Sequence, residues 1–379
     1  MRIELYDSIT KVPRESWNRL ARPHSETLSW EFWQVVEQSG LNDFAYRHAM
    51  LLDEHGEPQA ITSFYSVTTD IAIFAPPGLR VFLNRLRRWF PNFLKLRMLE
   101  WGSPVTINSP PFARSEAFSD RQVIEAMDEV LRRTARAEGH FLIVVRDFEP
   151  NAQNLRSIFR RRGYHWTSSL PNTYMEIRWP TPERYWGAMR SYYRSKLKKY
   201  LKRNQQAGVH HRLVEDFGSM AEVLHHQWMV VHQHAKEFQR ETLTPAFYGE
   251  LARTLEGRAR VILFYRGEAL VGHALLLVDG DMLRWLYVGR AEAENDGLYI
   301  YIAHQVVVTA IALGVKRLEM GLTTYPIKQD LGAEVTPIFM ALRAASGWIN
   351  PFVGLGYALL NHVPQPNPRP VFKATNVAA

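Results

Sequence analysis

The stretch RVILFYRGEALVGHALLLVDGDMLRWLYVG, residues 260–289, decides the fold that we expect for this chain. Its runs of Val, Leu, Ile and aromatic residues are interrupted by Arg-Gly-Glu and Asp-Gly-Asp, a pattern typical of strands joined by tight turns. It therefore predicts a β-hairpin. The elements expected around this hairpin are a strand at 209–216, helices at 219–236 and 245–255, an apolar helix at 297–314 and a strand at 316–321.

The first half of the chain repeats this order of elements. We expect a strand at 1–6, helices around 14–21 and 30–40, a strand hairpin at 46–74, a strand at 97–102, a helix at 119–139, and strands at 140–148 and 173–179. A strand near 336–343 closes the second half. This pattern predicts two mixed α/β domains, 1–180 and 181–379. At the junction, Thr181, Pro182 and Glu183 predict the N-cap and first turn of a helix.

Composition narrows the class of protein. The chain has 379 residues, 46% of them hydrophobic, and eleven Trp, which suits buried cores and excludes a disordered chain. It has no cysteine, and so no disulfide, thiolate metal site or thiol nucleophile. Neither a secretory signal nor an uncharged apolar run long enough to span a bilayer is evident. We expect a cytoplasmic protein, either free or peripheral at the membrane.

Three motifs of the second half resemble a known group. They are the loop GRAEAENDG at 289–297, the segment YPIKQDLGA at 325–333 and the basic helix SKLKKYLKRNQQAGV at 195–209. In order and spacing, residues 185–345 are similar to the second domain of double-GNAT acyltransferases, a group that includes Fem-type aminoacyltransferases and CelD-like acetyltransferases. Residues 1–180 resemble the first domain in pattern alone. The resemblance implies two tandem GNAT-like domains, each a mixed, largely antiparallel sheet flanked by helices.

The resemblance also implies a function. It is transfer of an acyl or aminoacyl group to an amine, forming an amide, with acyl-coenzyme A, acyl-carrier protein or aminoacyl-tRNA as co-substrate and no tightly bound cofactor. The C-terminal domain would be the donor and catalytic side, and the N-terminal domain the scaffold and acceptor side. The alternative is a catalytically silent GNAT-fold protein that binds an anionic partner or a membrane surface.

The donor cleft expected from this resemblance has an unusual phosphate loop. GNAT-like sheets splay two parallel strands, so that backbone groups can pair with the donor while its phosphates meet the next helix. The loop here lacks the R/Q-x-x-G-x-G/A spacing of coenzyme A users, and its Glu292 and Glu294 would face a pyrophosphate. Fem-type proteins depart in a similar way. The predicted donor-binding residues are Leu286, Tyr287, Val288, Arg290, Gly297, Lys198, Lys199 and Lys202.

The basic helix expected at 192–207 has two interpretations. Tyr193, Leu197, Tyr200 and Leu201 recur at helical spacing and predict one buried stripe. The remaining surface carries Arg194, Lys196, Lys198, Lys199, Lys202 and Arg203. These cations would guide a tRNA backbone, the acidic face of a carrier protein or a phosphate-bearing acceptor, with binding that weakens as salt rises. Alternatively, the helix is a solvated connection that needs no partner.

Four residues are candidates for the chemistry. The resemblance assigns Glu319 as the acid that orients the amine or accepts its proton, and Tyr325 as the donor of a proton to the leaving group. It implies that the positive charge of Lys328 binds a donor or acceptor phosphate or stabilises the developing oxyanion. His273, inside a predicted strand, would act on the amine. The alternatives are a loop-capping Glu319, a packed Tyr325, a solvated Lys328 and a hydrogen-bonded core His273.

Several further features stay open at this level. Gly102, Ser103, Asn108 and Ser109 would form an acceptor pocket or simply a proline-rich connection. The basic and aromatic segment 79–101 suits contact with anionic lipid, a lid over an acyl chain, or a packed helix with snorkelling Arg stems. The apolar segment 346–364 would close a core, line an acyl tunnel or touch a membrane. The histidines lack metal-ligand spacing, so we expect no metal site.

Overall fold

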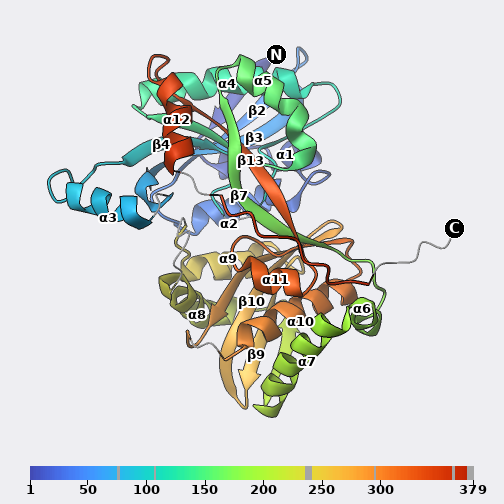
Figure 1. The fold of residues 1–379 in the computed structure, drawn as a ribbon. Coiled ribbons are helices and arrows are strands. Elements are labelled where there is room, and N and C mark those ends of the chain that lie inside the picture. Colours follow the sequence, from blue (N-terminus) through green and yellow to red (C-terminus); the bar gives the residue numbers. More distant parts are fainter. Residues whose placement is uncertain (75–76, 106–107, 235–240, 294–295, 361–362, 374–379) are drawn as a thin grey trace. The chain divides into compact units, whose positions relative to one another are not determined.

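A computed structural model describes residues 1–74, 77–105, 108–234, 241–293, 296–360 and 363–373 (Figure 1). The chain divides into two compact units. Unit 1 comprises Met1–Pro171 and Pro337–Pro364, and unit 2 comprises Asn172–Thr336 and Gln365–Ala379. Within the described ranges, no helix is both long and apolar enough to cross a membrane.

Unit 1 is built on a mixed sheet with the order β1-β2-β3-β4-β6-β13. Neighbouring strands are antiparallel except β4 and β6, which run parallel. The short strand β5 pairs with β3. The strands are β1 (Arg2–Tyr6), β2 (Ala45–Leu52), β3 (Pro58–Asp70), β4 (Lys95–Trp101), β5 (Phe112–Arg114), β6 (Leu142–Phe148) and β13 (Glu334–Ala344).

Helices cover both faces of the unit 1 sheet. The capped helix α4 (Asp120–Ala137) packs its apolar side on the face formed by Leu99, Ile143 and neighbouring residues. Helix α12 (Asn350–Leu360) packs on the opposite face, which follows from the alternation of side chains along a strand. The other helices are η1 (Ile9–Lys11), α1 (Arg14–Ala21), η2 (Glu26–Leu28), α2 (Trp30–Gln38), η3 (Ile71–Phe74), α3 (Pro77–Leu86), η4 (Pro150–Leu155) and α5 (Arg156–Arg161).

Unit 2 repeats the same pattern of strand directions. Its order is β7-β12-β11-β10-β9-β8, with β11 and β12 parallel and the other neighbours antiparallel. Its strands are β7 (His165–Glu176), β8 (Val209–Val214), β9 (Ala259–Arg266), β10 (Ala269–Asp279), β11 (Met282–Arg290) and β12 (Arg317–Glu319). The predicted hairpin is therefore present as β9, β10 and β11. The predicted fold class, two mixed and largely antiparallel α/β units, is confirmed.

The helices of unit 2 also lie on both faces of its sheet. Helices α6 (Pro182–Ala188), α7 (Ser191–Gln206) and α10 (Leu298–Ala312) share one apolar core with β9 to β12. Thr181 caps α6 through its side chain, with Pro182 in the first turn, as predicted. The remaining helices are η5 (Gly218–Met220), α8 (Ala221–His234), α9 (Pro245–Thr254) and α11 (Tyr325–Asp330).

The strands that close the two sheets differ from the sequence-based expectation. The strand predicted at 173–179 was expected to complete the first half of the chain. It forms the end of β7, which pairs through Tyr174 and Glu176 with β12 of unit 2. The strand predicted near 336–343 was expected to close the second half. It forms most of β13, which pairs through Phe339 to Ala344 with β6 of unit 1. Units 1 and 2 therefore depart from the predicted division into 1–180 and 181–379. Apolar alternation indicates that a strand forms, but its neighbour is chosen by tertiary packing.

Candidate functional site

The two parallel strands of unit 2 separate after three residue pairs. The ladder between β11 and β12 runs from Met282↔Arg317 to Arg284↔Glu319. Strand β11 then continues to Arg290, paired on its other side with β10. Beside the point of separation, β11 contains one extra residue relative to β10, because Leu275 pairs with Tyr287 and Leu276 pairs with Trp285. Leu286 is thus the bulged residue, and bulges often redirect backbone groups next to active sites.

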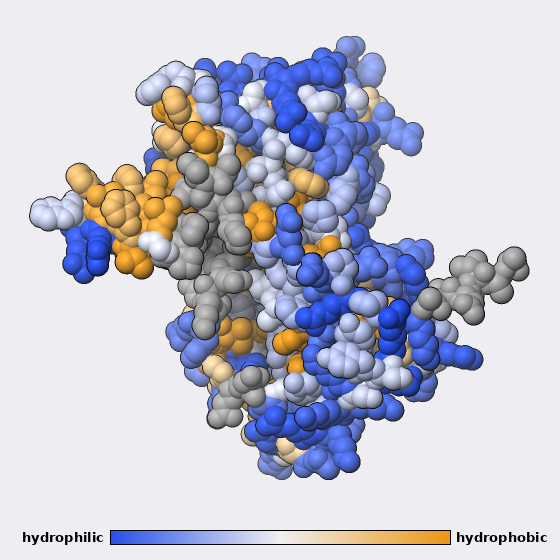
Figure 2. Space-filling view, viewed as in Figure 1, coloured by the Kyte–Doolittle hydropathy of each residue, from blue (hydrophilic) through white to orange (hydrophobic). Residues whose placement is uncertain are grey.

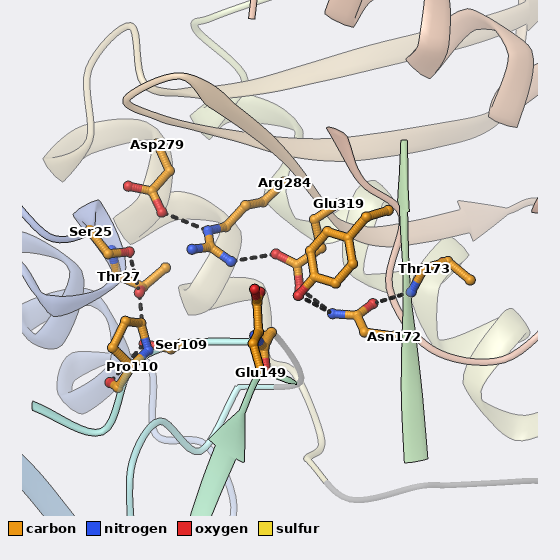
Figure 3. A network of polar contacts seen from close by, with 12 residues as sticks. Ser25, Thr27, Ser109, Pro110, Glu149, Asn172, Thr173, Asp279, Arg284 and Glu319 are labelled. Carbon is orange, nitrogen blue, oxygen red and sulfur yellow. Dashed lines mark hydrogen bonds and ion pairs between the residues drawn. The ribbon is translucent and has the colours of Figure 1, made fainter. Parts of the chain in front are cut away.

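A buried polar network marks the same point (Figure 3). Arg284 and Glu319, the last pair of the ladder, form an ion pair. The Nε atom of Arg284 also donates to Asp279 over 2.7 Å, and Asn172 donates to the other oxygen of Glu319 over 2.6 Å. Both oxygens of Glu319 are therefore engaged. This arrangement suits a residue that holds the strand end more than one that takes a proton from an amine.

The loop after β12 has a strained backbone. Gly321 has φ 76°, and the consecutive residues Thr323 and Thr324 have φ 60° and 46°. β-Branched residues rarely adopt this left-handed conformation, which costs free energy and is found most often at functional sites. Thr173 holds the loop by donating from its hydroxyl to the Gly321 carbonyl over 2.5 Å. A Cβ atom on Gly321 would lie 3.8 Å from the carbonyl oxygen of Trp285, so this loop lies beside the bulge in β11.

Lys328 projects from α11 toward this loop. Its side chain is 3% exposed, and its Nζ atom donates to the carbonyls of Gly321 over 3.0 Å and Leu322 over 2.6 Å. Burial lowers the pKa of Lys328 to about 7, although Glu319 opposes the shift. A neutral amine has two N–H groups and one lone pair. The two carbonyls match the two N–H groups, so the lone pair can accept a proton.

Tyr325 occupies the first position of the same short helix and is buried. It lies three residues before Lys328, on one helical turn, so the structure places the Tyr and Lys of the predicted motif together on α11. The role of Tyr325 as a proton donor remains a prediction.

The N-terminus of α10 is occupied by a carboxylate of the chain itself. Asp296 accepts from the backbone N–H of Leu298 over 2.9 Å, and it is held by Arg290 over 2.8 Å and Arg266 over 3.1 Å. A helix N-terminus attracts anions, and the phosphates of the donor are predicted to meet this helix. Predicted donor residue Arg290 therefore pairs within the chain. Glu294 lies outside the described residues, and Glu292 is exposed.

The basic helix α7 packs directly against this helix start. A Cβ atom on Gly297, which caps α10 with φ 83°, would lie 2.8 Å from the ring of Tyr200. Leu197, Leu201 and Asn204 are buried, so part of the predicted apolar stripe is confirmed. The cations Lys198, Lys199, Lys202 and Arg203 are exposed on the outer side. Lys196, in contrast, forms an ion pair with Asp330 over 2.6 Å.

His273 has the environment of a structural residue. It is completely buried, and its ring nitrogens lie 3.1 Å from the Tyr248 hydroxyl and 3.0 Å from Gln227 Oε1. Burial lowers its pKa to about 3. A Cβ atom on Gly289 would lie 2.1 Å from its ring, so only glycine fits there. The geometry favours the core alternative over action on an amine.

Three predicted donor residues lie on the bulged part of β11. Leu286 is buried, and Tyr287 and Val288 are half-buried. The Tyr287 hydroxyl donates to Glu241 over 2.6 Å, and the Trp285 side chain donates to the Tyr287 carbonyl over 3.0 Å. The backbone of this segment, more than its side chains, is what faces the separation of the strands.

Some important residues were not found by sequence reasoning. Arg284 and Asn172 hold Glu319, and Asp296 blocks the helix start. A charged Arg within an apolar strand was the one available signal for a buried ion pair. Trp285 and Tyr299 stack with their rings 5.7 Å apart beside the loop, where the Tyr299 hydroxyl lies 3.0 Å from the Thr324 hydroxyl. No local pattern links these aromatic residues.

The predicted acceptor residues lie within unit 1, in the connection between β4 and β5. Gly102, Ser103, Asn108 and Ser109 are all buried. Figure 3 shows Ser109 in a chain of hydroxyl groups with Thr27, 2.7 Å away, and Ser25. Asn108 donates to Glu149 over 2.9 Å, and the Ser103 carbonyl accepts from Arg146 over 3.2 Å. The N–H of Gly102 donates to the Ser63 carbonyl over 3.2 Å, so each of the four residues has a structural hydrogen bond, and an acceptor role stays a prediction. The described residues contain no group of side chains able to hold a metal ion.

Comparison with known proteins agrees with this geometry. Residues 189–329 match a family model described as an acetyltransferase (GNAT) domain. The solved structure of FemX has a TM-score of 0.56 with 10% identity, covering 89% of this chain and 97% of that one. A tandem GNAT protein from the clavulanic acid biosynthesis pathway has a TM-score of 0.51 with 10% identity, covering 91% and 99%. Residues 189–329 are thus similar to a GNAT domain, and the chain has the fold of tandem GNAT proteins.

A curated relative comes from Mycobacterium tuberculosis (strain ATCC 25618 / H37Rv). It is a putative 8-amino-7-oxononanoate synthase 2, 28% identical over 323 residues, which are 83% of this chain. The match spans 42% of the relative's length. The similarity therefore concerns less than half of that protein.

Proposed function

We propose that unit 2 is an N-acyltransferase, which moves an acyl or aminoacyl group from an activated ester or thioester to an amine and so forms an amide. One observation carries this proposal. Lys328, with a pKa near 7, donates to the carbonyl of Gly321, and Gly321 lies beside the bulged strand β11. A poised amine beside a redirected strand backbone is a suitable arrangement for acyl transfer.

The chemistry has a role for each part of the site. An acceptor amine arrives largely as an ammonium ion and must lose a proton before it attacks. The neutral amine of Lys328 accepts this proton, because its pKa lies near the working pH. Attack on the donor carbonyl forms a C–N bond and an oxyanion, which backbone N–H groups around Leu286 to Val288 stabilise. Collapse breaks the bond to the donor oxygen or sulfur, and Tyr325 supplies the leaving group with a proton. The amide nitrogen, cationic after the attack, returns a proton to Tyr325, and Lys328 releases its proton to solvent.

A binding site for the donor's anionic groups is better supported on α7 than at the start of α10. Asp296 places a negative charge where the pyrophosphate of a coenzyme A donor would lie. The exposed cations Lys198, Lys199 and Lys202 lie on the helix that packs against Gly297. A donor carried by tRNA or by an acyl-carrier protein has many anionic groups for such a face. Acyl-coenzyme A remains a donor to be compared with these two.

The decisive experiment is a donor comparison followed by one substitution. The purified chain is incubated with acetyl-coenzyme A, long-chain acyl-coenzyme A, acyl-carrier protein and aminoacyl-tRNA, with a panel of amines, and amide products are detected by mass spectrometry. Transfer by the wild type that falls about a hundredfold in Lys328→Met, but not in Lys316→Met, supports the proposal. Lys316 is a suitable control because it is exposed and paired with Asp281.

Two outcomes contradict the proposal. Equal transfer by Lys328→Met and wild type removes Lys328 from the reaction. No transfer from any donor, with retained binding of tRNA or carrier protein, favours the alternative of a silent GNAT-fold protein that binds an anionic partner. The name of the curated relative is not carried over, because that protein is more than twice as long as the matched region.

A further inference from the structure

Exposed apolar side chains are concentrated in unit 1, in the segments 79–93 and 348–355 and at Phe141, which lies between them in the sequence. Fifteen large apolar side chains are exposed in the described part of the chain, and ten of them lie here. Trp89 is 81% exposed and Trp348 is 78% exposed. The ten are Leu79, Val81, Phe82, Trp89, Phe90, Phe93, Phe141, Trp348, Phe352 and Leu355. We call them the apolar surface of unit 1.

Backbone contacts join the two segments at one end of the unit 1 sheet. The N–H of Phe141 donates to the carbonyl of Arg97 over 2.8 Å, at the start of β4. The carbonyl of Phe141 accepts from the N–H of Ala345 over 3.0 Å, just before Trp348. Figure 2 shows apolar side chains on the side of unit 1 that carries α3 and α12. The surface is therefore one region assembled from segments more than 250 residues apart in the chain.

The charge around this surface has one sign. Residues 71–99 contain six Arg and Lys residues and no Asp or Glu, and residues 344–368 contain no Asp, Glu, Lys or Arg. Arg85, Arg88, Lys95 and Arg97 are exposed. Arg87 differs, because it pairs with Asp70 and donates to the carbonyl of Phe93 over 2.9 Å. That contact fixes the turn that carries Trp89 and Phe90.

We propose that the apolar surface of unit 1 docks on an anionic phospholipid bilayer. Exposed Trp and Phe side chains beside Arg and Lys are the composition of segments that lie in the interface between lipid and water. The basic residues would attract anionic headgroups, while the rings enter the headgroup layer. The proposed contact is with the surface of the membrane, and no described helix is able to span it.

The charges argue against a second copy of the chain as the occupant. A twofold interface would bring the same basic segment of two copies together, and like charges would face each other without acidic partners from residues 71–99. An acyl-chain lid would not need the exposed cations. The docking proposal is independent of the proposed function, because vesicle binding requires no turnover.

The experiment is flotation of the full chain with vesicles. Vesicles of phosphatidylcholine with 30% phosphatidylglycerol, about a third anionic lipid, are compared with pure phosphatidylcholine. We expect wild-type protein to float with the anionic vesicles and to lose binding as salt rises. Trp89→Ser with Trp348→Ser, and separately Arg85→Glu with Arg88→Glu, should each reduce the bound fraction at least tenfold. Tyr192→Ser is the matched control, because Tyr192 is an aromatic residue 69% exposed in unit 2.

Several results would overturn the proposal. If the wild-type protein does not float with anionic vesicles, the proposal is wrong. It is also wrong if the control and both double variants bind the vesicles equally. A concentration-dependent dimer in sedimentation analysis that the Trp variant abolishes would assign the surface to a second copy. Quenching of Trp fluorescence by a free fatty acid, without vesicle binding, would assign it to a lid. Circular dichroism identifies a variant that has failed to fold, and the charge variant then carries the test.

Discussion

Arg284 and Glu319 are the last residue pair of the parallel ladder between β11 and β12, and their buried side chains form an ion pair at the same place. The backbone register and the side-chain bond thus end the pairing together. Beyond this point lie the bulge at Leu286, the strained loop and Lys328. The ion pair therefore stabilises the end of the ladder at the residues where the strands separate.

Glu319→Gln should destabilise unit 2 by about 3 kcal/mol, because Arg284 would keep a buried charge with Asp279 as its remaining acidic partner. Denaturant unfolding measures this loss. The double variant with Arg284→Met should recover part of it, since the buried cation that lost Glu319 is then removed as well. Equal destabilisation by the single and double variants would mean that the pair is not coupled.

Lys328→Met should change how stability depends on pH. The pKa of Lys328 is about 7 when folded and 10.5 for the ordinary group, so the unfolded chain binds more protons between these values. Stability of the wild type relative to Lys328→Met should therefore rise between pH 7 and pH 10, by about 1 kcal/mol per pH unit. Unfolding free energies at pH 7.5 and 9.5 measure this slope. A difference that does not vary with pH would show that Lys328 is not desolvated.

Asp296→Asn should increase affinity for acetyl-coenzyme A about tenfold, because it removes a negative charge from the N-terminus of α10. Native mass spectrometry or calorimetry measures the dissociation constant. Asp281→Asn is the control, since Asp281 is an exposed acid paired with Lys316. An unchanged affinity would place any phosphate contact of the donor away from this helix.

Lys198→Glu with Lys199→Glu should weaken binding of a tRNA or carrier-protein donor and should lower the dependence of affinity on salt by about two charges. The same charge change in Arg160→Glu with Arg161→Glu, on exposed residues of α5, serves as control. Filter binding or fluorescence anisotropy across a salt series measures both. If the two variants behave alike, the face of α7 has no special role.

Tyr325→Phe should lower kcat about a hundredfold while leaving donor binding unchanged, if its hydroxyl protonates the leaving group. Steady-state kinetics with a good and a poor leaving group distinguishes this role, because the better leaving group needs less help. A wild-type rate in the variant would leave Tyr325 with a packing role. Its buried position at the start of α11 accommodates either result.

Local sequence determined the elements of this protein. The hairpin at 260–289, the helix cap at Thr181 and the basic helix that became α7 follow from side-chain periodicity, turn residues and capping, which act over a few neighbouring positions. The order of elements in the two halves also predicted two mixed α/β units, and the resemblance of residues 185–345 to a known family implied that they are GNAT-like. The motif pair Tyr325 and Lys328 was found because its spacing is local.

Tertiary structure alone decided the partners of those elements. In the folded chain, β7 pairs with β12 in the sheet of unit 2, and the end of β13 pairs with β6 in the sheet of unit 1. Tertiary structure also buried Lys328, which lowered its pKa, and it brought Asp296 to the start of α10. The physical reason is that strand pairing, desolvation and ion pairing depend on groups distant in the chain. Periodicity and turn chemistry record the local preferences of a segment and contain no information about which distant surface will cover it.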